Sequence, residues 1–188
     1  MWALIESGSI TEIYTKPKSI TVGDINYPSN IFSLWTRAER EAIGLANVLE
    51  DNTNFKDKKY YTNTDITYTV QTDVTINELD YTKVVTAAYG TATAHTLSDL
   101  KTTHTTNINT QAGSLLQDTD WMVVRAAEGG TAVPSATTTW RAAVRTKANA
   151  MQVQIGNAAN VDALAALYAY NDATPPVRPL GEFPVLGA

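Results

Sequence analysis

The chain has 188 residues, of which 44% are hydrophobic, and it contains no cysteine. This length allows one ordinary domain or two small ones with a buried core. Lysine and arginine number 14 against 19 acidic residues, and the formal net charge of -5 argues against a nucleic-acid or anionic-lipid partner. Without cysteine the chain has no disulfide, no thiolate nucleophile and no zinc site built from thiolates.

The N-terminal segment alternates only briefly between apolar and polar residues and includes Glu6. It therefore predicts neither a signal peptide nor a transmembrane span. No later run approaches the roughly 20 apolar residues that cross a bilayer. We expect a soluble protein without a membrane partner.

Residues 1–85 are expected to form a small β-rich module. The break Ser7-Gly8-Ser9 lies inside an alternating segment and predicts a β-hairpin. Residues 58–77 are rich in Tyr, Thr, Ile and Val, and they predict a second hairpin with its turn at Asn63-Thr64-Asp65.

The same module is expected to contain one short helix. Thr36 is followed three residues later by Glu39, and this spacing is a capping box that predicts a helix start. Gly44 is expected to end this helix after about two turns, because glycine readily adopts the conformation that ends helices.

The hydrophobic period changes after residues 86–96, a run of small residues that we interpret as a linker. Residues 97–170 are expected to form a helical domain, so the predicted fold class is α+β. One apolar stripe contains Leu97, Leu100, His104, Ile108, Ala112 and Leu115, and a second contains Trp140, Val144, Lys147, Ala148, Met151 and Ile155. Asn160 is expected to cap a third helix.

Residues 171–188 contain four prolines and are expected to form an extended C-terminal arm. The arm is too apolar for a purely solvated tail and needs a surface to lie on, either the protein's own core or that of a partner. Its apolar residues are Val177, Leu180, Phe183, Val185 and Leu186.

The stretch "LLQDTDWMVVRAAEGGTAVPSATTTWRAAVR", residues 115–145, combines two tryptophans, three arginines and several acids. Asp118 and Asp120 suit either acid/base or cation chemistry or the capping of the next helix, and the pattern favours capping. Trp121 is expected to face Trp140 across a turn at Gly129-Gly130.

Three arginines, Arg125, Arg141 and Arg145, are expected on the outer edges of this helical hairpin. They would pair with Glu128 or Asp118, or with an acidic partner. A self-satisfied, solvated arginine face is the favoured interpretation.

No pattern in the chain indicates catalysis, a cofactor or a metal. His95 and His104 have no nearby carboxylate or third ligand, so they make a poor metal site. Nucleophile-elbow, phosphate-loop and dinucleotide motifs are absent from the sequence. We expect no catalytic, cofactor-binding or metal-binding residues.

Residues 115–145 resemble the helical hairpin of tail assembly and tail-fibre assembly chaperones of tailed bacteriophages. The family usually has tyrosine where this chain has Trp140, a change that keeps an aromatic anchor. The matching positions are Leu115, Leu116, Thr119, Asp120, Trp121, Arg125, Glu128, Gly130, Val133, Pro134, Trp140, Arg141 and Arg145.

The N-terminal half is similar to modules that precede this hairpin in such phage proteins, although its pattern is less specific. The similarity covers "YPSNIFSLWTRAEREAIGL" and the strand start that follows it in residues 55–61. Its matching positions are Tyr27, Pro28, Asn30, Leu34, Glu39, Ile43, Gly44 and Leu45.

The resemblance implies a non-enzymatic protein that binds a phage tail-fibre or baseplate protein as an assembly chaperone. Such a protein would be found in the host cytoplasm during assembly and be either released or retained in the virion tail. A permanent tail, baseplate or fibre-adaptor subunit is the main alternative, and self-association into a homo-oligomer is compatible with both. The candidate contact residues are Trp35, Trp121, Arg125, Trp140, Arg141, Arg145, Leu180 and Phe183.

Two other interpretations stay open. The tryptophans serve an internal core as readily as an interface. A small cell-wall hydrolase would instead use Asp118 and Asp120 or Glu128, although such chemistry needs one buried carboxyl and a fixed carboxyl separation.

Overall fold

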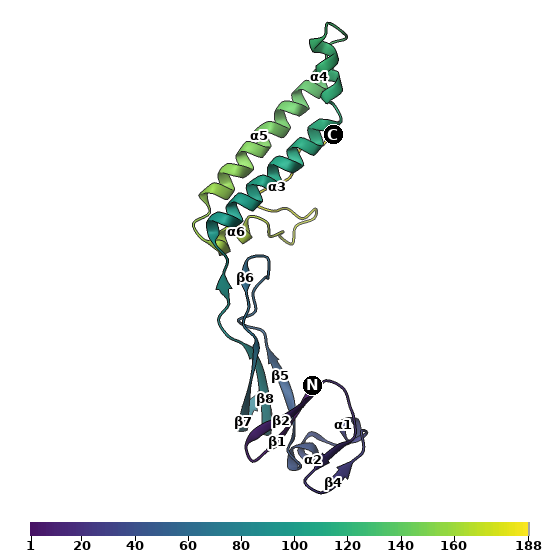
Figure 1. Ribbon diagram of the computed structural model, residues 1–188, viewed down its shortest axis with the longest axis vertical. Coiled ribbons are helices and arrows are strands. Elements are labelled where there is room, and N and C mark those ends of the chain that lie inside the picture. The colour runs from purple at the N-terminus through teal and green to yellow at the C-terminus, as the bar shows by residue number, and fades with distance from the viewer. Residues whose placement is uncertain (188) are drawn as a thin grey trace. The chain divides into compact units, whose positions relative to one another are not determined.

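The computed structural model describes residues 1–187, and the chain divides into two compact units, Met1–Thr93 and Ala94–Ala188 (Figure 1). The first unit contains the sheet and two short helices, and the second is helical. The predicted α+β class is therefore confirmed.

Five strands form the main sheet of the first unit, in the order β2-β1-β5-β8-β7. Their bounds are β1 (Trp2–Glu6), β2 (Ser9–Tyr14), β5 (Leu45–Asp51), β7 (Ile66–Ile76) and β8 (Leu79–Tyr89). Neighbouring strands are antiparallel except β5 and β8, which run parallel. Strands β1 and β2 form the hairpin that the Ser7-Gly8-Ser9 break predicts, with Ser7 and Gly8 both at positive φ.

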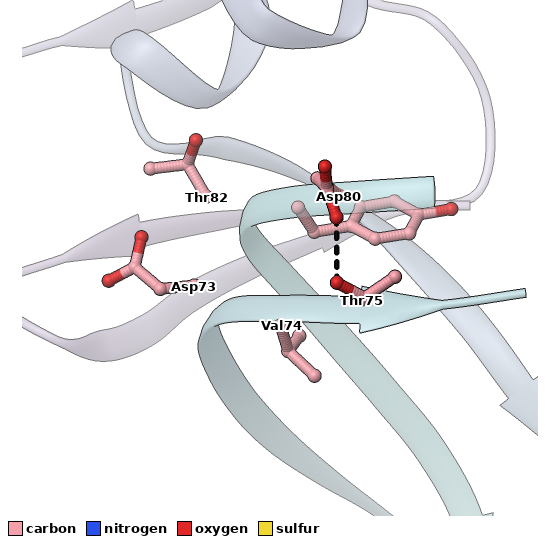
Figure 2. A pocket seen from close by; sticks show the side chains of 6 residues that line it. Asp73, Val74, Thr75, Asp80 and Thr82 are labelled. Atoms are coloured by element: carbon pink, nitrogen blue, oxygen red, sulfur yellow. Dashed lines mark hydrogen bonds between the residues drawn. The ribbon is translucent and has the colours of Figure 1, made fainter. Parts of the chain in front are cut away.

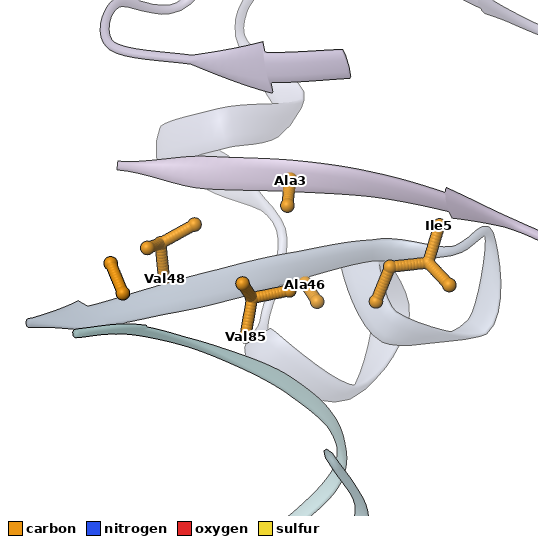
Figure 3. Close-up of a cluster of buried hydrophobic side chains, with 6 residues drawn as sticks. Ala3, Ile5, Ala46, Val48 and Val85 are labelled. Carbon is orange, nitrogen blue, oxygen red and sulfur yellow. The ribbon is translucent and has the colours of Figure 1, made fainter. Parts of the chain in front are cut away.

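Alternate residues of a strand point to opposite faces of the sheet, and each face carries its own apolar cluster. One cluster packs under β3 (Ile20–Val22), β4 (Ile25–Tyr27) and α1 (Ile31–Leu34), and its buried members are Leu4, Tyr14, Ile20, Ile31, Phe32 and Leu45. The other cluster consists of the smaller residues Ala3, Ile5, Ala46, Val48, Val85 and Ala87 (Figure 3). Ile10 and Ile13 from β2 and Val70 from β7 pack against it.

Helix α2 (Arg37–Ala42) begins as predicted. The Thr36 hydroxyl accepts a hydrogen bond from the Glu39 backbone amide, and the Glu39 carboxylate accepts one from the Thr36 amide at 2.7 Å. Gly44 follows the helix with φ +86°, and a Cβ at this position would collide with the carbonyl oxygen of Ile5. Glycine is thus needed both to leave the helix and to let β1 approach.

The second hairpin differs from the prediction. Strand β7 starts at Ile66 and pairs with β8 up to Ile76 except at Asp73, which has φ 50°, and the chain turns at Asn77 and Glu78 instead of at residues 63–65. These two turn residues have φ values of 49° and 63°, the positive values that a tight hairpin with right-handed strand twist requires. The turn contains no glycine, so it lacks the usual signal for such a hairpin.

The expected linker at residues 86–96 begins inside strand β8. Ala87 is buried between Glu50 of β5 and Tyr68 of β7 in the ladder. Ala87 belongs to the buried cluster of small residues on one face of the sheet, so this run of small residues is part of a central strand and not a linker. After it comes β9 (Thr93–Ala94), which forms a two-stranded sheet with β6 (Tyr61–Thr62).

The second unit is built on two long helices, α3 (Leu97–Gln117) and α5 (Ser135–Asn157), which lie side by side (Figure 1). The short helices α4 (Asp120–Ala127) and α6 (Val161–Ala166) follow α3 and α5. The middle of each predicted stripe is buried, namely His104, Ile108 and Ala112 on α3 and Val144, Ala148, Met151 and Ile155 on α5. The predicted cap of α6 is confirmed, because Asn160 Oδ1 accepts a hydrogen bond from the Ala163 amide at 2.8 Å.

The C-terminal arm lies on its own helical unit. Leu180 is fully buried, and its amide donates to the Leu167 carbonyl at 3.0 Å. The arm has no helix or strand from Asn171 to Gly187, and Ala188 lies outside the described residues. Across residues 1–187, none of the helices combines the length and the apolar character that a membrane span requires.

Candidate functional site

The predicted site, residues 115–145, contains a buried arginine that ties the end of α3 to α5. Arg141 extends from α5, and its Nη1 donates to the Leu116 carbonyl at 2.8 Å and to Thr119 Oγ1 at 2.5 Å. Its Nη2 donates to Asp120 Oδ1 at 2.6 Å. Planar guanidinium groups suit such multiple contacts, so this one side chain fixes the turn between α3 and α4.

The predicted side-chain cap of the helix that follows this turn is absent from the structure. Thr119 precedes α4 but makes no side-chain cap; its buried hydroxyl donates to the Leu116 carbonyl at 3.0 Å and accepts from Arg141. Asp120 pairs with Arg141. Leaving a buried guanidinium without hydrogen-bond acceptors costs more free energy than leaving a helix amide bonded to water. The Thr119 and Asp120 oxygens therefore accept from Arg141 instead of from the first amides of α4.

Helix α4 exposes its apolar side chains. None of its residues is buried, and Trp121 and Val124 are each 55% exposed while Val123 is 42% exposed. The Arg125 guanidinium lies 4.8 Å from the centre of the Trp121 ring. The prediction that Trp121 packs across the turn against Trp140 is therefore wrong, because the main helical hairpin is formed by α3 and α5.

The turn after α4 depends on two glycines. The Gly129 amide donates to the Ala126 carbonyl at 3.2 Å and the Gly130 amide to the Arg125 carbonyl at 3.0 Å. With Gly129 at φ +84°, this is the pair of hydrogen bonds that closes many helix ends. A Cβ on Gly130 would lie 2.8 Å from Arg125 Cγ and 2.9 Å from the Arg125 carbonyl oxygen, so this close turn requires glycine. Arg125 Nε donates to the Thr131 carbonyl at 3.3 Å, just after the turn.

Trp140 faces the C-terminal arm. Its Nε1 donates to the Pro184 carbonyl at 2.9 Å, and about two helical turns further along α5 Lys147 Nζ donates to the Leu180 carbonyl at 2.8 Å. The arm therefore runs back along α5 toward the start of that helix. The role of Lys147 was missed from the sequence, although a lysine within an apolar stripe is the signal of a side chain whose head reaches a polar partner.

Aromatic and charged contacts tie the base of the arm. Arg178 pairs with Glu182 at 2.8 Å, and its guanidinium lies 5.7 Å from the Tyr168 ring centre and 5.5 Å from that of Tyr170. The Tyr170 hydroxyl donates to Glu182 Oε1 at 2.7 Å, and this hydrogen bond raises the pKa of Tyr170. The arm is thus held at Leu180, at Pro184 and at this charged cluster.

The remaining candidate contact residues lie in different surroundings. Arg145 is exposed, and Phe183 is half-buried in the docked arm. Trp35 is half-buried in the first unit, where its ring meets Tyr27 edge-on at 5.5 Å. The expectation that Arg141 lies on an outer edge is wrong, and Leu180 is also covered in this conformation. Trp121 on α4 and Arg145 on α5 are exposed, and Arg125 is half-buried beside Trp121.

The acids of the hydrolase alternative lie on the surface. Asp118, Asp120 and Glu128 are all exposed, whereas a glycosidase acid needs a buried environment. Among residues 1–187, no three His, Asp or Glu side chains lie close enough together to hold a metal ion.

A shallow pocket of about 280 Å³ lies elsewhere, beside the β7–β8 turn of the first unit (Figure 2). Both of its acids, Asp73 and Asp80, are exposed, and Asp80 Oδ1 accepts a hydrogen bond from Thr75 at 2.6 Å. The pocket does not adjoin any of the predicted contact residues.

Comparisons of this chain with models of protein families, with curated proteins and with solved structures found no match.

Proposed function

We propose that this protein binds another component of a bacteriophage tail, a tail-fibre or baseplate protein, and acts as a non-enzymatic assembly chaperone. The proposal rests on the resemblance of residues 115–145 to the helical hairpin of such chaperones. It is supported by the exposed apolar surface that helix α4 carries within the same stretch.

The exposure of Trp121 carries the proposal. Trp121 and Val124 are one helical turn apart, so they form one apolar surface on α4. A large aromatic side chain left in water forgoes a burial free energy of about 2 kcal/mol or more. Exposed tryptophans flanked by arginine are typical of the residues that dominate the binding energy of protein interfaces.

Arg125 prepares the Trp121 ring for a partner. The guanidinium lies 4.8 Å from the ring centre, and this cation–π contact favours one orientation of the ring before binding. A side chain that is already ordered loses less entropy when it enters a pocket. Arg125 Nε also donates to the Thr131 carbonyl at 3.3 Å, so the chain just after the Gly129-Gly130 turn helps to hold the guanidinium.

The test is a pull-down of this protein co-expressed with the tail-fibre and baseplate proteins encoded beside it. The combined substitutions Trp121→Ala and Val124→Ser are expected to reduce capture of the partner at least about tenfold, since a single interface hot spot contributes 2 kcal/mol or more. Val153→Ser is the matched control, because Val153 is 61% exposed on α5. Equal capture of the partner by the wild type, the double variant and Val153→Ser would contradict the proposal that α4 binds the partner.

Deleting the arm is a poor test of the same proposal. Leu180 is fully buried in the helical unit, so a chain that ends before it would lose part of its own core. Substitutions on exposed positions separate binding from folding. Circular dichroism of each variant shows whether the helices are intact.

A further inference from the structure

The outer edge of β7 is a long unpaired strand. β7 lies at one end of the sheet order and spans eleven residues, Ile66–Ile76. An unpaired edge exposes backbone donors and acceptors that can join another strand. The other edge strand, β2, is shorter, with six residues.

The ladders on both sides of β8 tell which backbone groups of β7 face outward. The Val48 amide of β5 donates to the Met1 carbonyl at 3.0 Å, so Val48 faces β1, and its neighbours Asn47 and Leu49 bond to β8 instead. In the parallel ladder, Val85 and Ala87 therefore face β5, and the even-numbered β8 residues bond to the odd-numbered residues of β7 opposite them. Ile66, Tyr68 and Val70 thus direct their amides and carbonyls outward.

The two edges differ in their protection. Edge strands that must stay single usually carry charge or proline. β2 has Glu12 at its centre, hydrogen-bonded to Lys18 at 2.5 Å, and this contact lowers the pKa of Glu12 so that the charge persists. Residues 66–72 of β7 contain no charge and no proline, and Asp73, at φ 50°, marks the end of this uncharged run (Figure 2).

Exposed apolar side chains adjoin the unprotected edge. Ile66 and Tyr68 are 37% and 39% exposed, and Val70, on the same face, is half-buried. A strand added beside β7 would cover this row while it bonded to the outward backbone groups. The surface therefore suits an uncharged β-strand with apolar residues at alternate positions.

We propose that two copies of this chain associate through antiparallel pairing of their β7 strands, with Tyr68 opposite Tyr68 of the partner subunit. This register places Ile66 opposite Val70 of the partner subunit and Thr67 opposite Thr69 of the partner subunit. Pairs of aromatic, β-branched and threonine residues stabilise antiparallel strands. The sequence Ile-x-Tyr-x-Val is apolar at both ends and so complements itself when it is reversed.

Charge selects this register over its neighbour. A shift that centres the pairing on Thr69 would place Asp65 opposite Asp73 of the partner subunit, and like charges directly opposite each other destabilise a ladder. The outward groups of Ile66, Tyr68 and Val70 allow only registers that pair even-numbered with even-numbered residues. The proposal concerns the first unit alone and does not depend on the role of α4.

The first test is sedimentation velocity of the full chain over a concentration series. The contact is smaller than the roughly 800 Å² per partner of a standard interface, so we expect dimers only at high protein concentration. Thr67→Lys with Thr69→Lys is expected to abolish the dimer, because it places lysines opposite one another. Thr67→Glu with Thr69→Lys should restore it, because the same positions then hold opposite charges.

These paired variants also control for folding, since both change the same two exposed threonines. Wild-type protein that stays monomeric at all concentrations would overturn the proposal. So would a dimer that is unchanged by the double lysine variant, or one that both double variants abolish.

The second test uses the absence of native cysteine. Tyr68→Cys alone is expected to form a disulfide-linked dimer, because facing residues at a hydrogen-bonded position are about 5.5 Å apart at Cα, within disulfide range. Ile66→Cys and Val70→Cys should cross-link when mixed and much less when separate. Val153→Cys on α5 measures random collisions, and cross-linking of the β7 variants at that background level would contradict the pairing.

Discussion

Trp140 and Arg141 on α5 and Trp121 and Arg125 on α4 are the same residue types within one short stretch, yet their surroundings differ. Arg141 is buried with three hydrogen-bond contacts, and Trp140 bonds to the arm. Trp121 is 55% exposed, and its ring is stacked only with the Arg125 beside it on the same helix.

The difference arises from what each helix faces. α5 packs against α3 on one side and against the arm on the other, so its side chains meet partners from the same chain. α4 has eight residues, none of them buried, and it lies between the ends of the two long helices. Aromatic and arginine residues thus serve the fold on α5 and remain available for contact on α4.

Arg141→Ala gives the largest expected effect. It removes three hydrogen bonds from a buried position, to the Leu116 carbonyl, the Thr119 hydroxyl and the Asp120 carboxylate, so we expect the free energy of unfolding of the helical unit to fall by about 3 kcal/mol. Chemical denaturation followed by helical circular dichroism measures this change. Arg145→Ala is the control on the same helix, because Arg145 is exposed and its loss should have little effect. Equal effects of the two substitutions would remove the distinction between buried and exposed arginines.

Leu180→Ala should come next. The side chain is fully buried, and removing buried leucine atoms costs about 2 to 3 kcal/mol. The lost free energy weakens the packing of the arm on the helical unit, so we expect faster protease cleavage within residues 171–187. Leu186→Ala, at a position that is 44% exposed, is the control. An arm that stays protected in Leu180→Ala would show that other contacts suffice to hold it.

Trp140→Phe should have a smaller effect of about 1 kcal/mol, because it removes the hydrogen bond from Nε1 to the Pro184 carbonyl but keeps an aromatic ring. Hydrogen exchange of the arm amides is the sensitive measurement, since only the end of the arm is tied at this point. Exchange that is unchanged from wild type would mean that this hydrogen bond does not hold the arm in solution.

Local patterns predicted the parts of the fold that depend on neighbours in sequence. The Thr36–Glu39 capping box, the Asn160 cap and the apolar stripes of α3 and α5 are such features, and the structure contains each of them. Their physical cause lies within one or two helical turns, so a short window of sequence contains the information.

Features that depend on distant residues could not be predicted in this way. The turn at Asn77 and Glu78 lacks glycine, and the small residues at the end of β8 form a strand because β5 and β7 pair with it on both sides. Asp120 was expected to cap a helix, but its carboxylate pairs with Arg141 instead. No local sequence pattern connects these two residues. For the same reason the sequence did not show which of the two tryptophans is covered by the arm.

Trp121→Ala should change stability least. The ring is more than half exposed and would lose mainly its stacking with Arg125, so we expect the free energy of unfolding to change by less than about 0.5 kcal/mol. Trp140→Ala is the matched comparison, because it removes the same side chain from a position that contacts the arm, and it should cost clearly more. Both are measured by denaturation of the full chain. If Trp121→Ala were the more destabilising of the two, the Trp121 ring would belong to the protein's own core, and α4 would lose the surface on which partner binding is proposed.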